Sequence, residues 1–211
     1  MDGDWPAIGK HGGTLEKSAS VNDDFIVRLF RACLTKHSSN SIAETLFYEM
    51  QHFKTVLHDE AGTAALGTSL ARALLPGLTI YLHGDLGAGK TALTRALLHA
   101  AGHAGHVKSP TYTLAEPYRV AIDGQAVEII HFDLYRMGSP EEFLDAGFRE
   151  HFNDHNICII EWPEKAQAVL PSPDIRVFLS ISPEQGRDVE LQALSDQGSR
   201  CLDRLHFAPN L

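Results

Sequence analysis

Short apolar runs and helical patterns alternate between residue 50 and about residue 195. The runs that we expect to form strands are 53–57, 78–83, 127–132, 157–160, 175–181 and 188–194. Apolar residues at helical spacing predict one helix after residue 60, ended by Pro76 and Gly77, and a second helix over 88–101. Strands separated by helices predict an α/β fold, with a mixed sheet flanked by helices.

The chain outside this region has a weaker pattern. Residues 1–22 are rich in Gly, Ser, Asp and Lys, which favours a flexible arm. Apolar spacing predicts an amphipathic helix over 23–36, and a shorter helical turn is expected over 42–47. Beyond about Ser195 there is no clear pattern. We therefore divide the chain into an N-terminal extension (1–49), a principal domain (50–195) and a C-terminal tail (196–211).

One loop between a predicted strand and a predicted helix has the spacing of a phosphate-binding loop. Residues 84–91 read GDLGAGKT, which fits the pattern G-x-x-x-x-G-K-[ST]. Gly84 and Gly89 allow the backbone to curl and to aim its N–H groups, with the helix N-terminus, at an anion. Lys90 is expected to reach the β- and γ-phosphates and Thr91 to offer its hydroxyl to Mg²⁺. The alternative, a Gly-rich turn that precedes Lys-Thr by chance, is disfavoured because the flanking strand and helix are both expected.

A second carboxylate is expected near the magnesium ion, at the end of a neighbouring strand. Asp133 follows the apolar run 127–132, and Glu161 follows the run 157–160. Spacing alone does not choose between them. For each residue the alternative is an ordinary solvated acid at a strand end.

The segment 108–114, KSPTYTL, follows the helix of the phosphate loop and carries hydroxyl groups and a proline. An extended segment of this kind is typical of a switch that senses the γ-phosphate. A simple surface crossover explains the same residues equally well, and the sequence leaves both interpretations open.

Composition restricts the environment and the partners. The chain has 18 Lys and Arg against 27 Asp and Glu, a net charge of −9, so unaided nucleic-acid binding is disfavoured. Three widely spaced cysteines without a C-x-x-C pair indicate a reducing cytoplasm and no cysteine metal site. No run of 18 apolar residues exists, so no membrane span is expected.

Four sequence blocks together resemble the TsaE (YjeE) family, the bacterial ATPase of tRNA threonylcarbamoyladenosine (t6A) synthesis. The blocks are GDLGAGKT (84–91), KSPTYTL (108–114), HFDLYR (131–136) and IIEWPEKA (159–166), and the resemblance runs from about residue 53 to residue 191. It implies a P-loop NTPase-like α/β fold, ATP and Mg²⁺ as ligands, a cytoplasmic location and an ATPase that is slow alone. It also implies TsaB and TsaD as partners, which modify adenosine 37 of tRNAs reading ANN codons, so that tRNA is reached only through the complex.

The resemblance also implies roles for individual residues. The phosphate contacts would be Gly84, Leu86, Gly87, Ala88, Gly89, Lys90 and Thr91. Glu161 of the E-W-P block would join Thr91 at the metal, which settles the choice that spacing leaves open. Asp133 and Thr111 would act with Lys90 in hydrolysis, as water-positioning acid and switch threonine. Trp162 would lie beside the site, and Glu60 would contact the nucleotide near its base.

Two other functions fit a phosphate loop. A P-loop small-molecule kinase should carry a lid with several arginines, but only Arg136 lies between Arg119 and Arg149. A GTPase should carry an N-K-x-D sequence, which is absent. The departure from the family is at the front, because its members usually begin near residues 53–60. The role of residues 1–49 is therefore left open.

Overall fold

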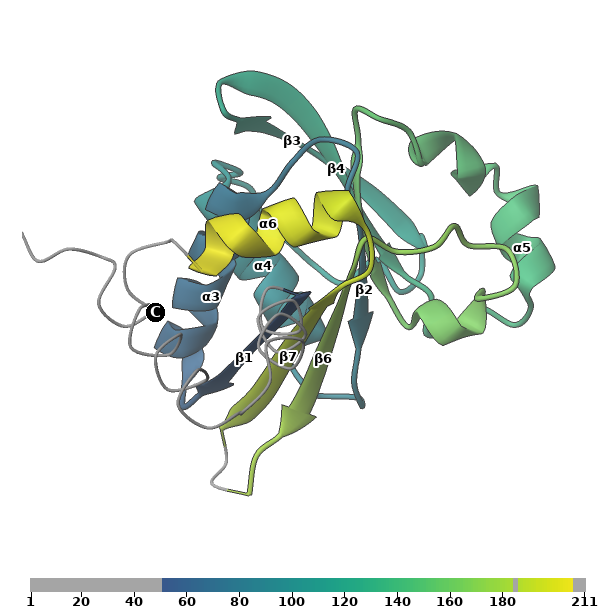
Figure 1. Cartoon of the computed structure of the whole chain (residues 1–211). Coiled ribbons are helices and arrows are strands. Elements are labelled where there is room, and N and C mark those ends of the chain that lie inside the picture. The colour runs from purple at the N-terminus through teal and green to yellow at the C-terminus, as the bar shows by residue number, and fades with distance from the viewer. Residues whose placement is uncertain (1–50, 184–185, 207–211) are drawn as a thin grey trace, which may run out of the picture.

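The computed structural model describes residues 51–183 and 186–206, which form a mixed seven-stranded sheet with helices on its faces (Figure 1). The arm and the helices predicted over 1–22, 23–36 and 42–47 lie outside the described residues. The strands are β1 (His52–Leu57), β2 (Thr79–His83), β3 (Ala115–Ile122), β4 (Gln125–Asp133), β5 (Ile157–Glu161), β6 (Ile175–Ile181) and β7 (Arg187–Ala193). Their order across the sheet is β1-β7-β6-β2-β5-β4-β3.

The centre of the sheet is parallel and its margins are antiparallel. Strand β2 pairs in parallel with β5 and β6, and β4 pairs in parallel with β5. The pairs β1–β7, β6–β7 and β3–β4 are antiparallel. Because parallel strands end at the same edge, the carboxyl ends of β2, β4 and β5 meet there. Asp133 and Glu161 are direct partners in the register of that edge.

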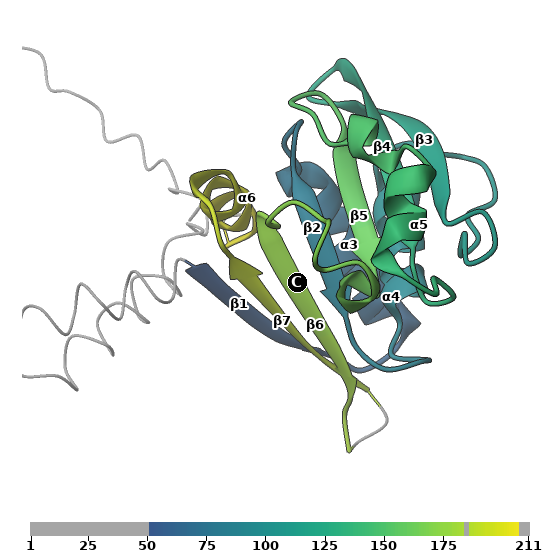
Figure 2. The ribbon, with the colours of Figure 1, turned by 90° about the vertical axis from the view of Figure 1, so that its right-hand side faces the viewer.

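Helices cover the sheet in two layers with separate apolar cores. Helices α3 (Glu60–Ala73), α4 (Lys90–Ala100) and α6 (Asp196–His206) lie on one face. Helix α5 (Pro140–Asp145) and the 3-10 turns η1 (Phe148–His151) and η2 (Pro163–Lys165) lie on the other face, over β4 and β5 (Figure 2). Phe132 and Phe143 of the second core are the largest of the fully buried side chains. The prediction of an α/β fold with a mixed, helix-flanked sheet is confirmed.

Side-chain capping and glycine geometry determine where the helices before and after β2 begin and how closely they pack. Asp59 caps α3 by accepting a hydrogen bond from the Gly62 N–H at 2.8 Å. Helix α4 begins at Lys90, two residues later than the pattern predicts, because Gly89 has a φ of 109° that a right-handed helix excludes. Gly67 lets α3 approach α4 closely, since a Cβ there would lie 2.5 Å from that of Ala96.

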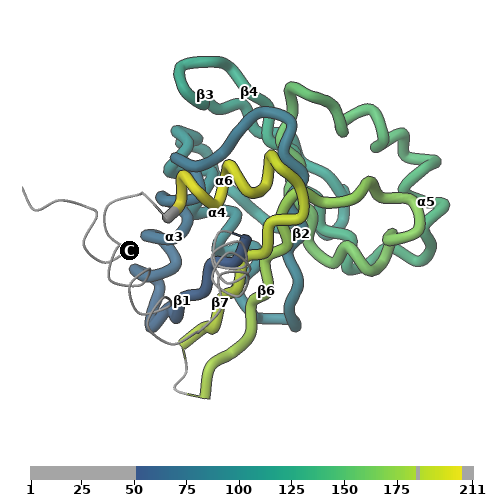
Figure 3. Tube along the Cα trace, in the orientation of Figure 1, coloured from purple at the N-terminus to yellow at the C-terminus, as the bar shows by residue number. Residues whose placement is uncertain are grey.

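Three elements are present where the sequence pattern predicts none. Strand β3 forms a hairpin with β4, joined at Asp123 and Gly124, which both have positive φ values (Figure 3). Helix α5 follows the end of β4. Helix α6 occupies residues 196–206, for which there was no clear pattern, and buries Cys201, Leu202 and Leu205.

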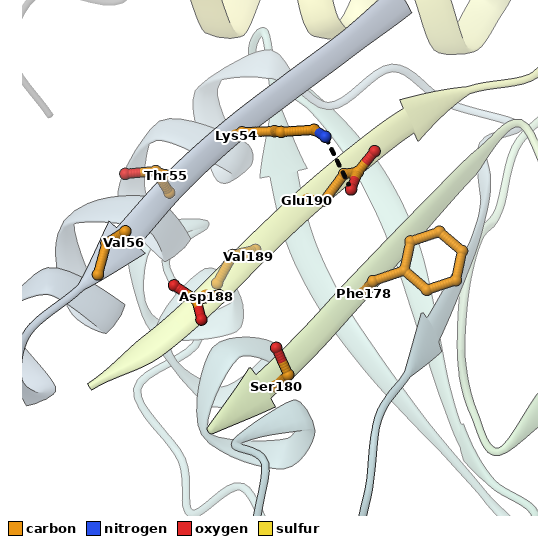
Figure 4. A pocket seen from close by; sticks show the side chains of 8 residues that line it. All are labelled: Lys54, Thr55, Val56, Phe178, Ser180, Asp188, Val189 and Glu190. Carbon is orange, nitrogen blue, oxygen red and sulfur yellow. Dashed lines mark ion pairs between the residues drawn. The ribbon is translucent and has the colours of Figure 1, made fainter. Parts of the chain in front are cut away.

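One sheet face stays open among the described residues. The outer face of β1, β7 and β6 has no described helix over it (Figure 2). A groove of about 380 Å³ crosses this face, with Phe178 at one side and an ion pair of 3.2 Å between Lys54 and Glu190 (Figure 4). Within the described ranges, no helix has the length and apolar character needed to cross a membrane.

Candidate functional site

The loop after β2 has the backbone of an anion cradle. Gly84, Gly87 and Gly89 have φ values of 143°, 81° and 109°, which glycine adopts without strain. A Cβ on Gly84 would lie 2.3 Å from the carbonyl oxygen of Leu179 on the neighbouring strand β6. No side chain caps α4, so the first N–H groups of this helix remain available to an anion.

Two cavities flank this loop. The larger one, about 580 Å³, is lined by Leu86, Gly87, Gly89, Lys90, Thr91, Ala92, Ser109, Thr111, Asp133, Tyr135, Arg136, Glu161 and Trp162. It therefore brings together most of the residues that the sequence predicts for the site, from four separate segments. The smaller cavity, about 340 Å³, is lined by Glu60 and Ala88 and shares Gly87 and Gly89 with the first. Gly84 lines neither cavity and stands at the start of the loop.

Lys90 is buried at the base of the larger cavity. Its ammonium donates hydrogen bonds to the carbonyl oxygens of Gly84 at 2.6 Å and Asp85 at 2.9 Å. It also lies 4.0 Å from the centroid of the Trp162 ring. Burial lowers the pKa of Lys90, and the nearby carboxylates, Glu161 foremost, act in the opposite direction. The ammonium is thus held by its own loop, at a position from which phosphate oxygens can take over its hydrogen bonds.

Glu161 is the carboxylate in contact with Thr91. The Thr91 hydroxyl donates to both Glu161 oxygens, at 2.8 Å and 3.1 Å, and the Glu161 side chain is almost fully buried. The Nε2 atom of His131 lies 2.8 Å from Oε1 of the same carboxylate. A hydroxyl and a carboxylate oxygen are hard ligands that fit Mg²⁺.

The described residues offer no cluster of three or more His, Cys, Asp or Glu side chains that would hold a metal by itself. In the usual protein site for Mg²⁺, one or two side chains contribute and phosphate oxygens and waters complete the shell. The donor set at Thr91 and Glu161 therefore fits an ion that arrives with a nucleotide.

Asp133 has different partners although it stands beside Glu161 in the sheet. It accepts hydrogen bonds from the hydroxyl of Ser109 and from the backbone N–H of Tyr135, the latter at 3.1 Å. Its own N–H donates to the carbonyl of Leu114 at 3.1 Å. Asp133 is thus attached at two points to the segment 108–114.

The sequence pattern predicts that 108–114 is extended, but in the structure this segment is not extended throughout. Residues 111–113 form a turn, in which the Leu114 N–H donates to the Pro110 carbonyl at 2.6 Å and Leu114 has a φ of 62°. Buried Pro110 and half-buried Leu114 anchor the two ends of the turn. Thr111 consequently lines the larger cavity while Tyr112, 81% exposed, points into solvent.

Sequence reasoning missed three residues of the site: His131, Tyr135 and Arg136. The Tyr135 ring centroid lies 4.9 Å from that of Trp162, and the Arg136 guanidinium lies 4.6 Å from the centroid of the Tyr112 ring. The signal was present in the spacing. His131 precedes Asp133 by two residues on one strand and therefore shares its face, and Arg136 follows the same strand end.

Glu60 lies apart from the acids, at the start of α3 and in the smaller cavity. Arg187 of β7 borders the same cavity and supports the phosphate loop. Its Nε donates to the Ala88 carbonyl at 3.1 Å, and a terminal nitrogen donates to the Gly87 carbonyl at 3.4 Å. The smaller cavity adjoins the loop on the side of α3, away from Asp133 and Glu161.

Known proteins resemble this chain over the whole region that carries both cavities. The family model described as threonylcarbamoyl adenosine biosynthesis protein TsaE matches residues 57–189. The tRNA threonylcarbamoyladenosine biosynthesis protein TsaE of Haemophilus influenzae is 42% identical over 158 residues, which cover 72% of this chain and 97% of that protein. The protein of the same description from Bacillus subtilis is 29% identical, with 75% and 96% covered.

A solved structure has the same fold. The crystal structure of YdiB from Bacillus subtilis superposes with a TM-score of 0.64, covering 76% of this chain and 97% of that chain at 24% identity. At this identity the likeness concerns the fold alone.

Proposed function

The chain belongs to the TsaE family of threonylcarbamoyl adenosine biosynthesis proteins, and from this premise we propose that it is a Mg²⁺-dependent ATPase of t6A synthesis. Family membership places the chain in the formation of threonylcarbamoyladenosine in tRNA. The proposal adds that it binds and hydrolyses ATP in the cytoplasm and acts on a TsaB–TsaD complex that modifies adenosine 37 of tRNAs reading ANN codons.

One observation carries the proposal. Lys90, Thr91, Asp133 and Glu161, which come from three separate segments, converge on a single cavity next to a glycine-rich loop. Three of these side chains are nearly inaccessible to water. Burying a lysine and two acids together has a large desolvation cost, and clusters of this kind are typical of ligand-binding and catalytic sites. A triphosphate with its metal ion would supply the matching charges.

The arrangement divides the work among the residues. The loop N–H groups and Lys90 bind the phosphates, with Trp162 beside the lysine, and Thr91 and Glu161 hold the metal. Bound Mg²⁺ would neutralise charge on the β- and γ-phosphates. Asp133 orients the attacking water, and Thr111 closes toward the γ-phosphate. Glu60 lies where the smaller cavity would receive the nucleoside, since both cavities share the loop.

Hydrolysis is proposed to act on partners through the segment 109–114. The Ser109 hydroxyl donates a hydrogen bond to Asp133. Loss of the γ-phosphate beside Asp133 would therefore affect this segment directly. Leu86, which lines the larger cavity, and Tyr112, whose ring contacts the cavity residue Arg136, are both exposed, so a partner protein can contact them. ATP turnover is expected to be slow for the chain alone, because the partner would stabilise the closed segment. The net charge of −9 favours reaching tRNA through that partner.

A small-molecule kinase is less well supported. Of the residues that line the larger cavity, Lys90 and Arg136 are the basic ones. A kinase lid usually supplies several cationic side chains to clamp the transferred phosphoryl group.

Replacing Lys90 tests the proposal. In cells depleted of the native protein, Lys90→Ala should fail to restore t6A, measured by mass spectrometry of tRNA nucleosides. The matched control is Lys54→Ala, which removes a lysine from the open sheet face and should restore the modification. Purified Lys90→Ala should also lose ATP binding by calorimetry. Restoration of t6A by Lys90→Ala would overturn the proposed function.

A further inference from the structure

We propose that His131 is a positioning residue that holds the Glu161 carboxylate in the orientation needed for Mg²⁺. The inference rests on the proposed function, because it concerns the metal that would accompany ATP. His131 itself lines neither cavity beside the loop. It would therefore act through Glu161 and not by contact with the nucleotide.

The contact is short and protected from water. The Nε2 atom of His131 lies 2.8 Å from Oε1 of Glu161, and the two side chains are 0% and 3% exposed. Strands β4 and β5 are parallel neighbours, in which His131 pairs with Ile159 and Asp133 pairs with Glu161. Residues two apart share a face, so the pairing brings the imidazole next to the carboxylate. The arrangement follows from the sheet and not from a mobile loop.

Glu161 is the single polar partner of this imidazole within the described residues. The other ring nitrogen, Nδ1, is buried and has no hydrogen-bond partner among them. An unpaired buried nitrogen is destabilising, and an apolar side chain at position 131 would avoid that cost. Because the carboxylate accepts, Nε2 must carry the ring proton in this contact. Among the described residues, the hydrogen bond of the His131 side chain is therefore made to Glu161.

Fixing Glu161 matters because an alternative partner lies close by. Among the charged groups that act on Lys90, Glu161 has the largest effect. A carboxylate free to rotate would turn toward this ammonium. Such a pair would occupy both the metal ligand and the phosphate-binding lysine. His131 holds Oε1, while Oε2 has, among the described residues, only the 3.1 Å contact with Thr91 and can exchange it for a metal ion.

A pair of amide substitutions separates this role from general packing. The amide nitrogen of His131→Gln can occupy the position of Nε2 and donate to Glu161. The side chain of His131→Asn is one methylene group shorter, so its amide nitrogen cannot reach Glu161. Ile129→Ala is the control for stability, because Ile129 is fully buried two residues earlier on the same face of β4. The full chain is used, with ATP and MgCl₂ as the probes.

The measurement is the Mg²⁺ dependence of ATP binding by isothermal titration calorimetry, with ATP affinity in EDTA measured alongside. His131→Asn should raise the Mg²⁺ concentration for half-maximal effect by about tenfold or more, as expected for loss of a group that orients a metal ligand. Affinity for ATP in EDTA should be unchanged. His131→Gln and Ile129→Ala should keep the wild-type Mg²⁺ dependence, although Ile129→Ala lowers the melting temperature.

Three results would overturn the inference and are distinguishable from one another. A wild-type Mg²⁺ dependence in folded His131→Asn would remove the positioning role and leave the proposed function intact. An equal shift in His131→Asn and Ile129→Ala would assign His131 a packing role only. If the wild-type chain binds no ATP with Mg²⁺, the proposed function fails, and the inference fails with it.

Discussion

Asp133 and Glu161 are partners in the sheet register, yet their hydrogen bonds assign them to different tasks. Glu161 is bonded to Thr91, which lines the larger cavity, and to His131, which does not line it. Asp133 is bonded to Ser109 and the Tyr135 amide, which belong to the segment that would cover the γ-phosphate. Under the proposed function, these two buried acids would separate metal binding from the positioning of water.

Asp133→Asn should abolish turnover while binding is retained. The amide keeps the shape of the side chain and removes the charge that would orient water, so kcat for ATP hydrolysis should fall about 10²- to 10⁴-fold. ATP affinity measured by calorimetry should change little. The comparison is Glu161→Gln, in which the Mg²⁺ dependence of binding should be weakened instead. Equal loss of ATP affinity in both variants would contradict this division.

His83, directly before the phosphate loop, should make stability depend on pH. Burial lowers the pKa of His83 from its ordinary value of 6.5, and Glu164, 3.7 Å away, only partly opposes this effect. The unfolded chain therefore binds the proton more tightly than the folded protein. The stability that neutral His83 contributes is present above about pH 6.5 and is lost as the pH falls through its lower folded pKa.

The test is urea unfolding of the wild type and His83→Gln at about pH 7.5 and about pH 5.5, on either side of the ordinary histidine pKa. The wild type should lose more free energy of unfolding between these conditions than His83→Gln. Other histidines contribute to both proteins, so only the difference reports on His83. The same loss in both proteins would show that this residue has no such effect.

At the scale of elements, the contact between α3 and α4 fixes the helix that begins at the phosphate loop. Gly67 allows this contact, because an added Cβ would lie 2.5 Å from Cβ of Ala96 and 2.8 Å from the backbone of α4. The helix axes cannot approach as closely with a larger residue at this crossing. The position of α4 and of its N-terminus thus depends on a glycine outside the nucleotide site.

Gly67→Ala should destabilise the protein. Overpacking costs about 1–3 kcal/mol, which exceeds the roughly 0.5–1 kcal/mol that Ala gains over Gly within a helix. Gly62→Ala is the matched control on the same helix, where the nearest atom would be 3.4 Å from the new Cβ. Thermal unfolding should show a lower melting temperature for Gly67→Ala and an equal or higher one for Gly62→Ala. A stabilised Gly67→Ala would contradict the close contact.

The elements also show what the sequence can and cannot predict. Strands β2, β4 and β5 are mostly apolar; β2 ends directly before Gly84, and β4 and β5 end at Asp133 and Glu161, so the sequence predicts their position beside the loop. Strand β3 lies at the sheet edge and contains Pro117, which weakens the pattern. Helix α6 has only a few apolar residues, and its stability comes from packing on β7, which directly precedes it, and on α3, which is distant in sequence.

The site, too, contains features that the sequence predicts and features that it does not. The phosphate loop is a local motif, so eight consecutive residues predict it. The two-residue spacing from Asp133 places His131 on the same face of its strand, but its contact with Glu161 joins residues 30 positions apart and follows only from the strand pairing. The turn at residues 111–113 depends on the anchoring of Pro110 and Leu114 in the fold. The hydroxyl-rich composition of the segment therefore predicts its chemistry better than it predicts its backbone conformation.

At the scale of the whole molecule, the described sheet brings both cavities to one edge and leaves the face of β1, β7 and β6 open (Figure 2). Among the described residues, the first core extends from Leu57 of β1 to Leu205 of α6. Helix α6 belongs to the first core through Cys201, Leu202 and Leu205, all nearly inaccessible to water. We therefore expect the folded domain to extend to residue 206.

Two truncations test these limits. A chain that ends at Ser195 loses the burial of Leu202 and Leu205, worth about 3–6 kcal/mol, a large share of the 5–15 kcal/mol that typically stabilises a domain. It should unfold at a much lower temperature or fail to fold. A chain that begins at Met50 keeps both cores and both cavities, so its melting temperature should change by less than about 2 °C and its ATP affinity should be unchanged. If the second truncation instead unfolds the protein, residues 1–49 are part of the domain, and the boundary at residue 50 is wrong.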